Sequence, residues 1–173
     1  MRTLNIRCPK EREGMTTQKS RQPNYSDVDF WNTRYGKGEP AHAQDGQGNF
    51  EWFPPQNAQD PVIKVLEDAG VRKGARILDI GCGNSRLSSQ LLDAGYRRVV
   101  GIDFSPVVIR QMQQQCQGRV RAGEAEYEHV QHFFVMDACK LSFSDGTFDA
   151  VVDKAFLICI STCSKGTFTL YFD

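Results

Sequence analysis

The sequence lacks an excess of charge of either sign. Its 21 Lys and Arg residues balance 21 Asp and Glu residues over 173 positions. Without a net electrostatic field, the composition does not favour nucleic acid or an anionic membrane as a partner. No apolar run reaches the roughly 20 residues needed to cross a bilayer, and none near the N-terminus resembles a secretion signal. We therefore predict a cytoplasmic protein with no nucleic acid and no membrane partner.

The patterns that build metal sites and disulfide frameworks are also missing. The chain has only three histidines, which are scattered, and none of its six cysteines forms a C-x-x-C pair. Most of the cysteines fall within apolar segments, which is typical of buried and reduced thiols. The sequence therefore predicts no metal site.

The length of 173 residues allows one domain with a single core. Residues 1–24 are polar and mixed in charge, and they contain no apolar core. Such a composition predicts a disordered tail, and Met15 is an alternative start of the protein. We expect residues 25–173 to form the folded domain, with 167–172 as a strand because this segment is rich in β-branched and aromatic residues.

What the sequence does contain is an apolar segment that runs into a glycine turn, RILDIGCGNSR over residues 76–86. Residues 76–80 predict a buried strand, and a helical pattern opens at about Ser85. Gly81 and Gly83 allow the backbone to pass close to a ligand. The first N–H groups of the helix would point at that ligand. The segment thus predicts the first half of a βαβ unit that binds a nucleotide-like cofactor.

The spacing of the turn discriminates between cofactors. A dinucleotide fingerprint needs a third glycine for close helix packing, and Arg86 stands at that position. An NAD-dependent oxidoreductase is therefore the weaker alternative. The residues Asp79, Gly81, Gly83 and Ser85 match the first motif of class I S-adenosylmethionine (SAM) methyltransferases, which the turn resembles. An ordinary glycine turn without a ligand remains the structural alternative.

A second predicted strand, residues 98–102, ends in Asp103. Asp103 lies about 20 positions beyond the glycines, where an acidic residue can accept hydrogen bonds from both ribose hydroxyls of a cofactor. The alternative is a solvated loop aspartate. The spacing favours the cofactor site.

Two further predicted strands end in polar residues. Residues 133–136 precede Asp137 and Ala138, and residues 148–152 precede Asp153 and Lys154. The carboxylate of Asp137 could accept from an adenine amino group while the N–H of Ala138 meets a ring nitrogen. Because the carboxyl ends of parallel strands lie on one rim, we expect all these residues to face the same crevice.

Aromatic residues are concentrated before the glycine turn. Trp31 and Tyr35 are four residues apart, on one face of a predicted helix, and Trp52 lies in the segment FEWFPP. They could form part of the core or one wall of a ligand site. The residues alone favour the core.

Taken together, six segments resemble the methyltransferase-like group of seven-strand SAM methyltransferases, whose members include lysine methyltransferases of translation elongation factor 1-alpha. The segments are FWNTRY, FEWF, LDIGCGNS, GIDFS, VMDA and FDAVVDK, within residues 29–160. The resemblance implies a Rossmann-like α/β parallel sheet in a three-layer α/β/α arrangement, SAM as cofactor and a protein lysine as substrate. The family's sheet has three more strands than the chain provides, so we expect an incomplete fold.

The resemblance also implies the residues of the SAM site. Trp31, Tyr35 and Trp52 would line it together with the motif residues Asp79 and Gly83. The remaining contacts would be Gly81 to the methionine end, Asp103 with Phe104 to the ribose and adenine, Asp137 with Ala138 to the adenine edge, and Lys154 as the far wall.

The resemblance weakens on the side of the methyl acceptor. After the Asp-Lys pair the family usually has Gly-Thr-Leu-Asp-Ala-Leu, whereas residues 155–160 of this chain are AFLICI. A catalytically inactive SAM-binding or interaction fragment is therefore the alternative function. We assign no catalytic residue, because methyl transfer to a neutral amine depends mainly on alignment. The sequence leaves the methyl acceptor and the oligomeric state open.

Overall fold

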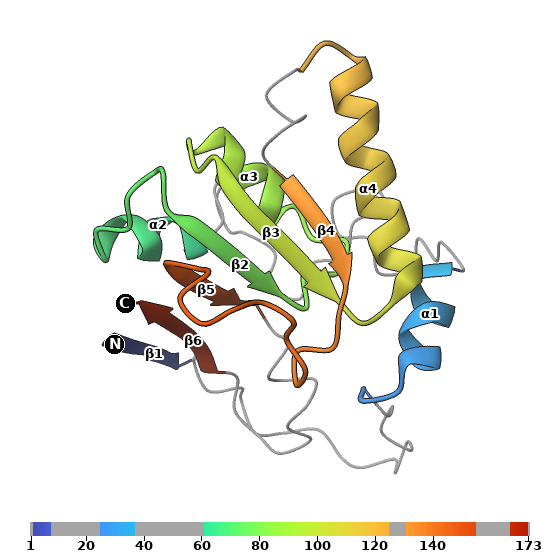
Figure 1. Cartoon of the computed structure of the whole chain (residues 1–173), viewed down its shortest axis with the longest axis horizontal. Coiled ribbons are helices and arrows are strands. Elements are labelled where there is room, and N and C mark those ends of the chain that lie inside the picture. The colour runs from blue at the N-terminus through green and yellow to red at the C-terminus, as the bar shows by residue number, and fades with distance from the viewer. Residues whose placement is uncertain (1, 8–24, 37–60, 125–130, 155–166, 173) are drawn as a thin grey trace, which may run out of the picture.

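The computed structural model describes residues 2–7, 25–36, 61–124, 131–154 and 167–172. Within them, strands and helices alternate along the central part of the chain (Figure 1). Their order is β1 (Arg2–Arg7), α1 (Val28–Gly36), α2 (Pro61–Asp68), β2 (Arg76–Ile80), α3 (Leu87–Asp93), β3 (Arg98–Asp103), α4 (Pro106–Arg121), β4 (Gln131–Val135), β5 (Ala150–Asp153) and β6 (Thr167–Phe172).

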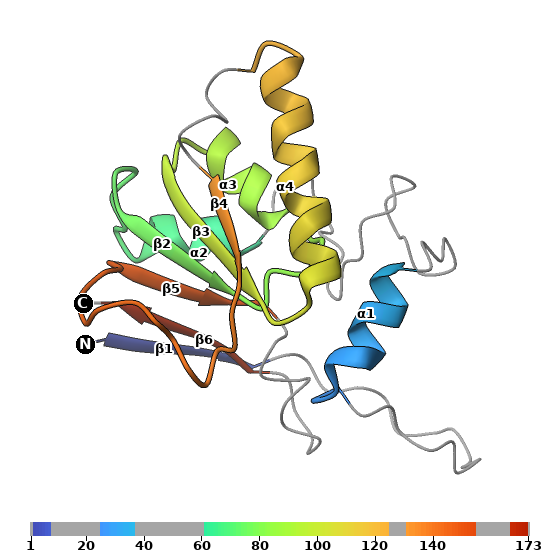
Figure 2. The ribbon, with the colours of Figure 1, turned by 45° about the vertical axis from the view of Figure 1, so that its right-hand side comes forward.

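The strands form a six-stranded sheet in the order β1-β6-β5-β2-β3-β4. The four strands β5, β2, β3 and β4 are parallel, whereas β6 runs antiparallel to β5 and β1 antiparallel to β6. The chain proceeds from β2 to β3 and β4 on one side and then returns to place β5 on the other side of β2 (Figure 2). This reversal creates a crevice at the carboxyl ends of β2 and β5, where open α/β sheets bind ligands. The parallel strands confirm the predicted Rossmann-like α/β sheet.

Helices α2, α3 and α4 cover one face of the sheet. The side chains of α2 and α3 pack on residues of β2, β3 and β5, including Ile77 and Val99. Helix α4 packs on Phe133 of β4, which is the register partner of Gly101. Since residues 99 and 101 point to the same face, all three helices form one layer. Leu92 of α3 packs directly against α4 within this layer.

The opposite face of the sheet is covered differently. Phe134, next to Phe133 and therefore on the other face, lies 6.5 Å from Phe143, and Phe143 packs edge-on against Phe148 at 4.9 Å. Both partners belong to the connection between β4 and β5. Among the described residues, no helix covers this face, so the second helical layer of the predicted three-layer arrangement is not observed there.

In the sequence, Ser105 followed by Pro106 predicts the start of a helix, and the structure confirms this start. The Ser105 side chain accepts a hydrogen bond from the N–H of Val108, and proline occupies the first turn of α4. The polar sequence of residues 118–131 predicts a connection without a helix, which is wrong for its beginning, because helix α4 continues to Arg121. Gly118 weakens a helix interior by only about 1 kcal/mol relative to alanine, and the apolar face that precedes it is already packed.

The prediction of a disordered tail over residues 1–24 is wrong for its beginning. Arg2–Arg7 forms β1, and each of its residues pairs with β6 in antiparallel register. Residues 2–7 read RTLNIR, with apolar residues at alternate positions, as half-buried strands have. A partner 160 to 170 positions away cannot be recognised from local composition. Residues 8–24 lie outside the described part of the chain. Strand β6 confirms the strand expected at 167–172.

Candidate functional site

The Asp103 carboxylate lies at the carboxyl end of β3 and bridges two backbone segments. Its Oδ2 atom accepts from the N–H of Gly83 at 3.2 Å, and its Oδ1 atom accepts from the N–H of Ser105 at 2.9 Å. The residue is only 7% exposed. Burial raises the pKa of Asp103 above its ordinary value, while the N–H groups of Ser105, Gly83 and Phe104 act in the opposite direction. The carboxylate is thus fixed in place, and its oxygens retain further lone pairs for a ligand. Phe104 itself is partly buried.

The glycine turn follows β2 and requires backbone that only glycine adopts readily. Gly81 has φ of 65° and Gly83 has φ of 52°, both in the left-handed region. The Tyr35 hydroxyl lies 3.0 Å from the position that a Cβ on Gly83 would occupy. Helix α1 therefore places a tyrosine hydroxyl directly over the turn.

Two residues of this region are buried, Cys82 within the turn and Asp79 in β2 just before it. The N–H of Cys82 donates to the carbonyl of Ile102 at 3.0 Å, which joins the turn to β3. Burial, followed by the negative charges of Asp79 and Asp103, raises the pKa of Cys82 well above its ordinary value. Asp79 is 2% exposed, and its Oδ2 accepts from the Ser88 hydroxyl at 3.4 Å. The thiol is therefore a neutral packing group and not a nucleophile.

Of the aromatic residues of α1, one belongs to the core and another faces the candidate ligand site. Trp31 is 5% exposed, and its indole N–H donates to the carbonyl of Tyr25 at 2.8 Å. Its ring stacks on Tyr35 at 5.7 Å. Trp31 thus belongs to a core that supports Tyr35, and Tyr35 faces the glycine turn. Trp52 lies outside the described residues.

The segment after β4 begins at the same rim. The N–H of Met136 donates to the carbonyl of Asp103 at 2.9 Å. Asp137 follows and is exposed, with its Oδ1 accepting from the N–H of Cys139 at 2.9 Å, and Ala138 is partly buried. Asp137 and Ala138 therefore lie next to the end of β3, where the sequence placed them.

The end of β5 brings a charged pair to the rim. Asp153 is 7% exposed and Lys154 is 9% exposed. Asp153 is the register partner of Ile80 in β2, so Lys154 follows the end of β5 as Gly81 follows the end of β2. The predicted site residues that the structure describes thus all gather at the carboxyl ends of the parallel strands, or above them on α1.

Sequence reasoning missed Asn32, which takes part in the same cluster. The Oδ1 atom of Asn32 accepts from the Ser105 hydroxyl at 2.7 Å, and the side-chain amide of Gln111 donates to the carbonyl of Tyr35 at 3.0 Å. Both contacts join α1 to α4 across more than 70 positions. No periodicity or local motif signals such a pairing.

Neither a metal cluster nor a membrane-spanning helix occurs among the described residues. No group of three or more His, Cys, Asp or Glu side chains in that part of the chain is arranged to hold a metal ion. No helix in the same part of the chain is long and apolar enough to span a membrane.

The segments that form the rim match a known protein family. The sequence profile described as "Methyltransferase domain" matches residues 77–168, more than half of the chain. The chain belongs to the methyltransferase domain family. The match begins in β2 and ends in β6, so it includes the glycine turn, Asp103 and the end of β5.

Relatives of this methyltransferase domain carry names that refer to elongation factor eEF1A. The human "eEF1A lysine and N-terminal methyltransferase" is 35% identical over 138 residues, which is 80% of this chain and 17% of the relative. The mouse "EEF1A lysine methyltransferase 4" is 33% identical over 135 residues, or 77% of this chain and 45% of the relative. The chain therefore spans less than half the length of either relative.

A solved structure shares the fold of this methyltransferase domain. Magnesium protoporphyrin IX methyltransferase from Synechocystis PCC 6803, determined with bound SAM, superimposes with a TM-score of 0.53 at 24% identity. The similarity covers 79% of this chain and 64% of that protein. At this identity the likeness confirms the fold class.

Proposed function

We propose that this methyltransferase domain binds SAM at the rim formed by the glycine turn and the ends of β3, β4 and β5. The observation that carries the proposal is the buried Asp103 carboxylate at the end of β3, which accepts from the N–H of Gly83 in the turn after β2. A fixed acceptor at a strand end, beside a left-handed glycine turn, fits the ribose hydroxyls of a nucleoside cofactor.

The other residues are proposed to hold the remaining parts of SAM. The glycine turn would hold the methionine part, because Gly81 and Gly83 leave no Cβ between the backbone and a ligand. Asp103 and Phe104 would contact the ribose and adenine, and Asp137 with Ala138 the adenine edge. The surrounding walls would consist of Trp31, Tyr35, Trp52, Asp79, Gly81 and Lys154.

When bound, SAM supplies an electrophilic methyl group on its sulfonium. The task of the protein residues is then to align an acceptor with that methyl group, an effect worth up to about 7–11 kcal/mol. A lysine acceptor must also lose its proton, which burial at the rim favours because desolvation destabilises the ammonium form. No general base is needed for this scheme.

A protein lysine is the proposed acceptor, with elongation factor eEF1A as the candidate substrate in the cytoplasm. Support comes from the names of the relatives, which refer to lysine methylation of eEF1A. Equal numbers of acidic and basic residues give no support to a nucleic acid substrate.

Calorimetry with S-adenosylhomocysteine (SAH), the demethylated product, tests the cofactor proposal. Wild type should bind SAH, and Asp103→Ala should weaken binding by about 1.5–3 kcal/mol, roughly ten- to over a hundredfold. NAD serves as the comparison ligand. Equal affinity in the variant, or tighter binding of NAD than of SAH, would refute the ribose assignment.

Transfer of labelled methyl from SAM to purified eEF1A tests the acceptor proposal. Label that resists removal of the protein N-terminus and is lost when the target lysine is replaced by arginine would support it. An absence of label on eEF1A, with label on other proteins of a cell lysate, would point to a different acceptor and leave the cofactor assignment intact.

A further inference from the structure

A closed circuit of contacts joins α1 to the glycine turn. Asn32 of α1 accepts from the Ser105 hydroxyl at 2.7 Å, and the N–H of Ser105 donates to Asp103 Oδ1 at 2.9 Å. Asp103 Oδ2 accepts from the N–H of Gly83 at 3.2 Å. Tyr35, also on α1, completes the circuit by placing its hydroxyl over Gly83. The position of α1 is thus linked to the same carboxylate and turn that form the proposed cofactor site.

Helix α1 is held against α4 at two points. Asn32 contacts Ser105 at the N-cap of α4, and the carbonyl of Tyr35 accepts from Gln111 on the second turn of α4. Asn32 and Tyr35 are three residues apart and so share one helix face. The ring of Trp31 also stacks on the ring of Tyr35. These contacts hold α1 beside the start of α4 (Figure 1), with the Tyr35 hydroxyl over the glycine turn.

Of these contacts, the Asn32–Ser105 hydrogen bond is the most sensitive to replacement. Ser105 is fully buried, and its hydroxyl oxygen already accepts from the N–H of Val108. Its proton is directed to Asn32. Removal of the Asn32 oxygen would leave a buried donor without this acceptor, which is more unfavourable than the loss of an exposed hydrogen bond.

We propose that Asn32 is a positioning residue that keeps α1 closed over the bound cofactor. The Asn32–Ser105 bond then determines how long an S-adenosyl compound stays bound. This inference rests on the proposed function, because it concerns the same site. Asn32 acts through α1 and the circuit, so its replacement should change the dissociation rate more than the association rate.

The informative variant is Asn32→Ala. Alanine favours the helical state more than asparagine does, so a weaker helix α1 cannot account for faster release. Ser105→Ala is less suitable, because it also removes the N-cap of α4. Thr33→Ala is the matched control, since Thr33 is the next residue of α1 and is exposed. Asn32→Asp retains an acceptor oxygen for the Ser105 hydroxyl.

The measurement is release of labelled SAH after addition of excess unlabelled SAH to the 173-residue chain. Asn32→Ala should release SAH roughly 3- to 10-fold faster than wild type, the factor expected for one hydrogen bond. Thr33→Ala and Asn32→Asp should release it at close to the wild-type rate. A purely structural defect would lower the number of binding sites per chain without changing the release rate, so the two effects are separable.

Two results would have different meanings. If wild type binds SAH and Asn32→Ala releases it at the wild-type rate, the positioning role is overturned and the proposed function stands. If wild type binds no SAH, the proposed function fails first, and the role of Asn32 fails with it.

Discussion

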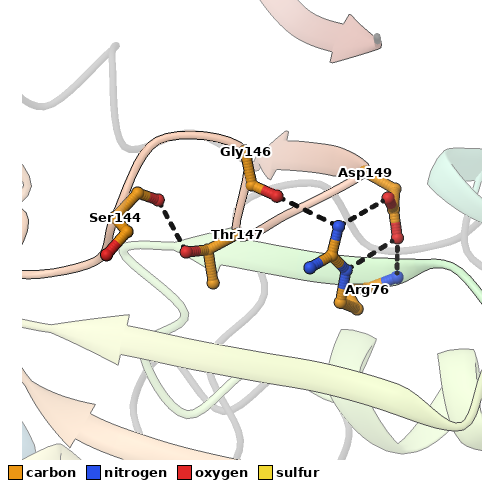
Figure 3. Close-up of polar contacts among 5 residues, drawn as sticks. All are labelled: Arg76, Ser144, Gly146, Thr147 and Asp149. Atoms are coloured by element: carbon orange, nitrogen blue, oxygen red, sulfur yellow. Dashed lines mark hydrogen bonds and ion pairs between the residues drawn. The ribbon is translucent and has the colours of Figure 1, made fainter.

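Arg76 and Asp149 form a two-point ion pair at the amino end of the sheet, opposite the candidate site (Figure 3). Arg76 Nη2 lies 2.9 Å from Asp149 Oδ1, and Arg76 Nε lies 3.1 Å from Oδ2. The backbone N–H of Arg76 also donates to Asp149 Oδ2 at 2.8 Å, and the N–H of Asp149 donates to the Arg76 carbonyl at 2.9 Å. The contact joins the starts of β2 and β5, whose pairing defines the crevice at the other end.

The first prediction concerns the pH dependence of this ion pair. Hydrogen bonds from the Arg76 side chain and then from its backbone N–H hold the pKa of Asp149 well below its ordinary value. A lowered folded-state pKa stabilises the protein above the unfolded-state pKa of about 3.9, and this stability is lost as the pH falls toward the folded-state value. Asp149→Asn should therefore lower the melting temperature at neutral pH, by an amount that shrinks below about pH 4.

Thermal unfolding of wild type and Asp149→Asn across this range would measure the difference. Asp145→Asn is the control, because Asp145 is an exposed carboxylate in the same connection. Both side chains of the pair remain more than a third exposed, at 42% and 38%, so solvent screens the interaction and the effect should be small. A difference that grows on acidification would contradict the predicted direction of the effect.

The second prediction concerns the cover that β6 provides for β5. Strand β5 is a short apolar strand whose edge is paired by β6, with Val151 opposite Tyr171. An uncovered apolar edge would pair with other chains. Tyr171→Pro removes a backbone N–H and should interrupt this ladder, whereas Tyr171→Ala keeps the N–H.

Light scattering coupled to size exclusion would compare the two variants at tens of micromolar. The proline variant should associate more than the alanine variant. If the two behave alike, the ladder between β5 and β6 does not protect the edge.

The third prediction concerns the close packing of Phe133 on β3. A Cβ on Gly101 would lie 2.7 Å from Phe133 Cδ1, closer than Cβ atoms approach other atoms in folded proteins, and would make a tight contact of 3.2 Å with Cys82 Sγ. Phe133 cannot move away easily, because it is 4% exposed and packed beneath α4. Gly101→Ala should therefore lower the free energy of unfolding by about 1–3 kcal/mol, as overpacking does.

Urea denaturation of Gly101→Ala, Phe133→Leu and the double variant would test this contact. Phe133→Leu provides space, so the cost of Gly101→Ala should be smaller in its presence. If the losses in the free energy of unfolding of the two single variants simply add in the double variant, the ring of Phe133 is not the group that excludes a larger side chain at position 101.

The features that the sequence predicted well are local ones. The β2 strand, the glycine turn and the start of α3 follow one another within 12 residues, and Asp103 follows at the end of the next strand. Because parallel strands align their carboxyl ends, the spacing alone was sufficient to predict that Asp103 lies beside the turn. The cap at Ser105 depends on residues within three positions, and it was predicted correctly as well.

The features that were missed depend on partners distant in the chain. The pairing of β1 with β6 and the contact between Asn32 and Ser105 join segments that no local pattern relates. The composition of residues 1–24 predicted a disordered tail, because it carries no information about the hydrogen bonds that β1 makes with a distant strand. Sequence reasoning also assigned Asp137 to the rim on spacing alone, and its role in ligand binding stays a prediction.

The last prediction concerns the protonation of Asp103. Burial raises its pKa in the ligand-free protein, so the carboxylate becomes protonated at a higher pH than an ordinary aspartate near 3.9. Ribose hydroxyls would donate to the ionised form, which lowers the pKa of Asp103 in the complex.

Because the pKa of Asp103 is lower in the complex than in the ligand-free protein, only the ionised form favours binding. The affinity for SAH should therefore fall as the pH drops below the ligand-free pKa, and it should become constant again below the pKa of the complex. Calorimetry from about pH 8 down to about pH 3.5, which includes the ordinary range of an aspartate, would record this loss, and Asp103→Asn, which cannot ionise, should show weaker affinity with little dependence on pH. A wild-type affinity that stays constant over this range would mean that the carboxylate of Asp103 does not accept from the cofactor.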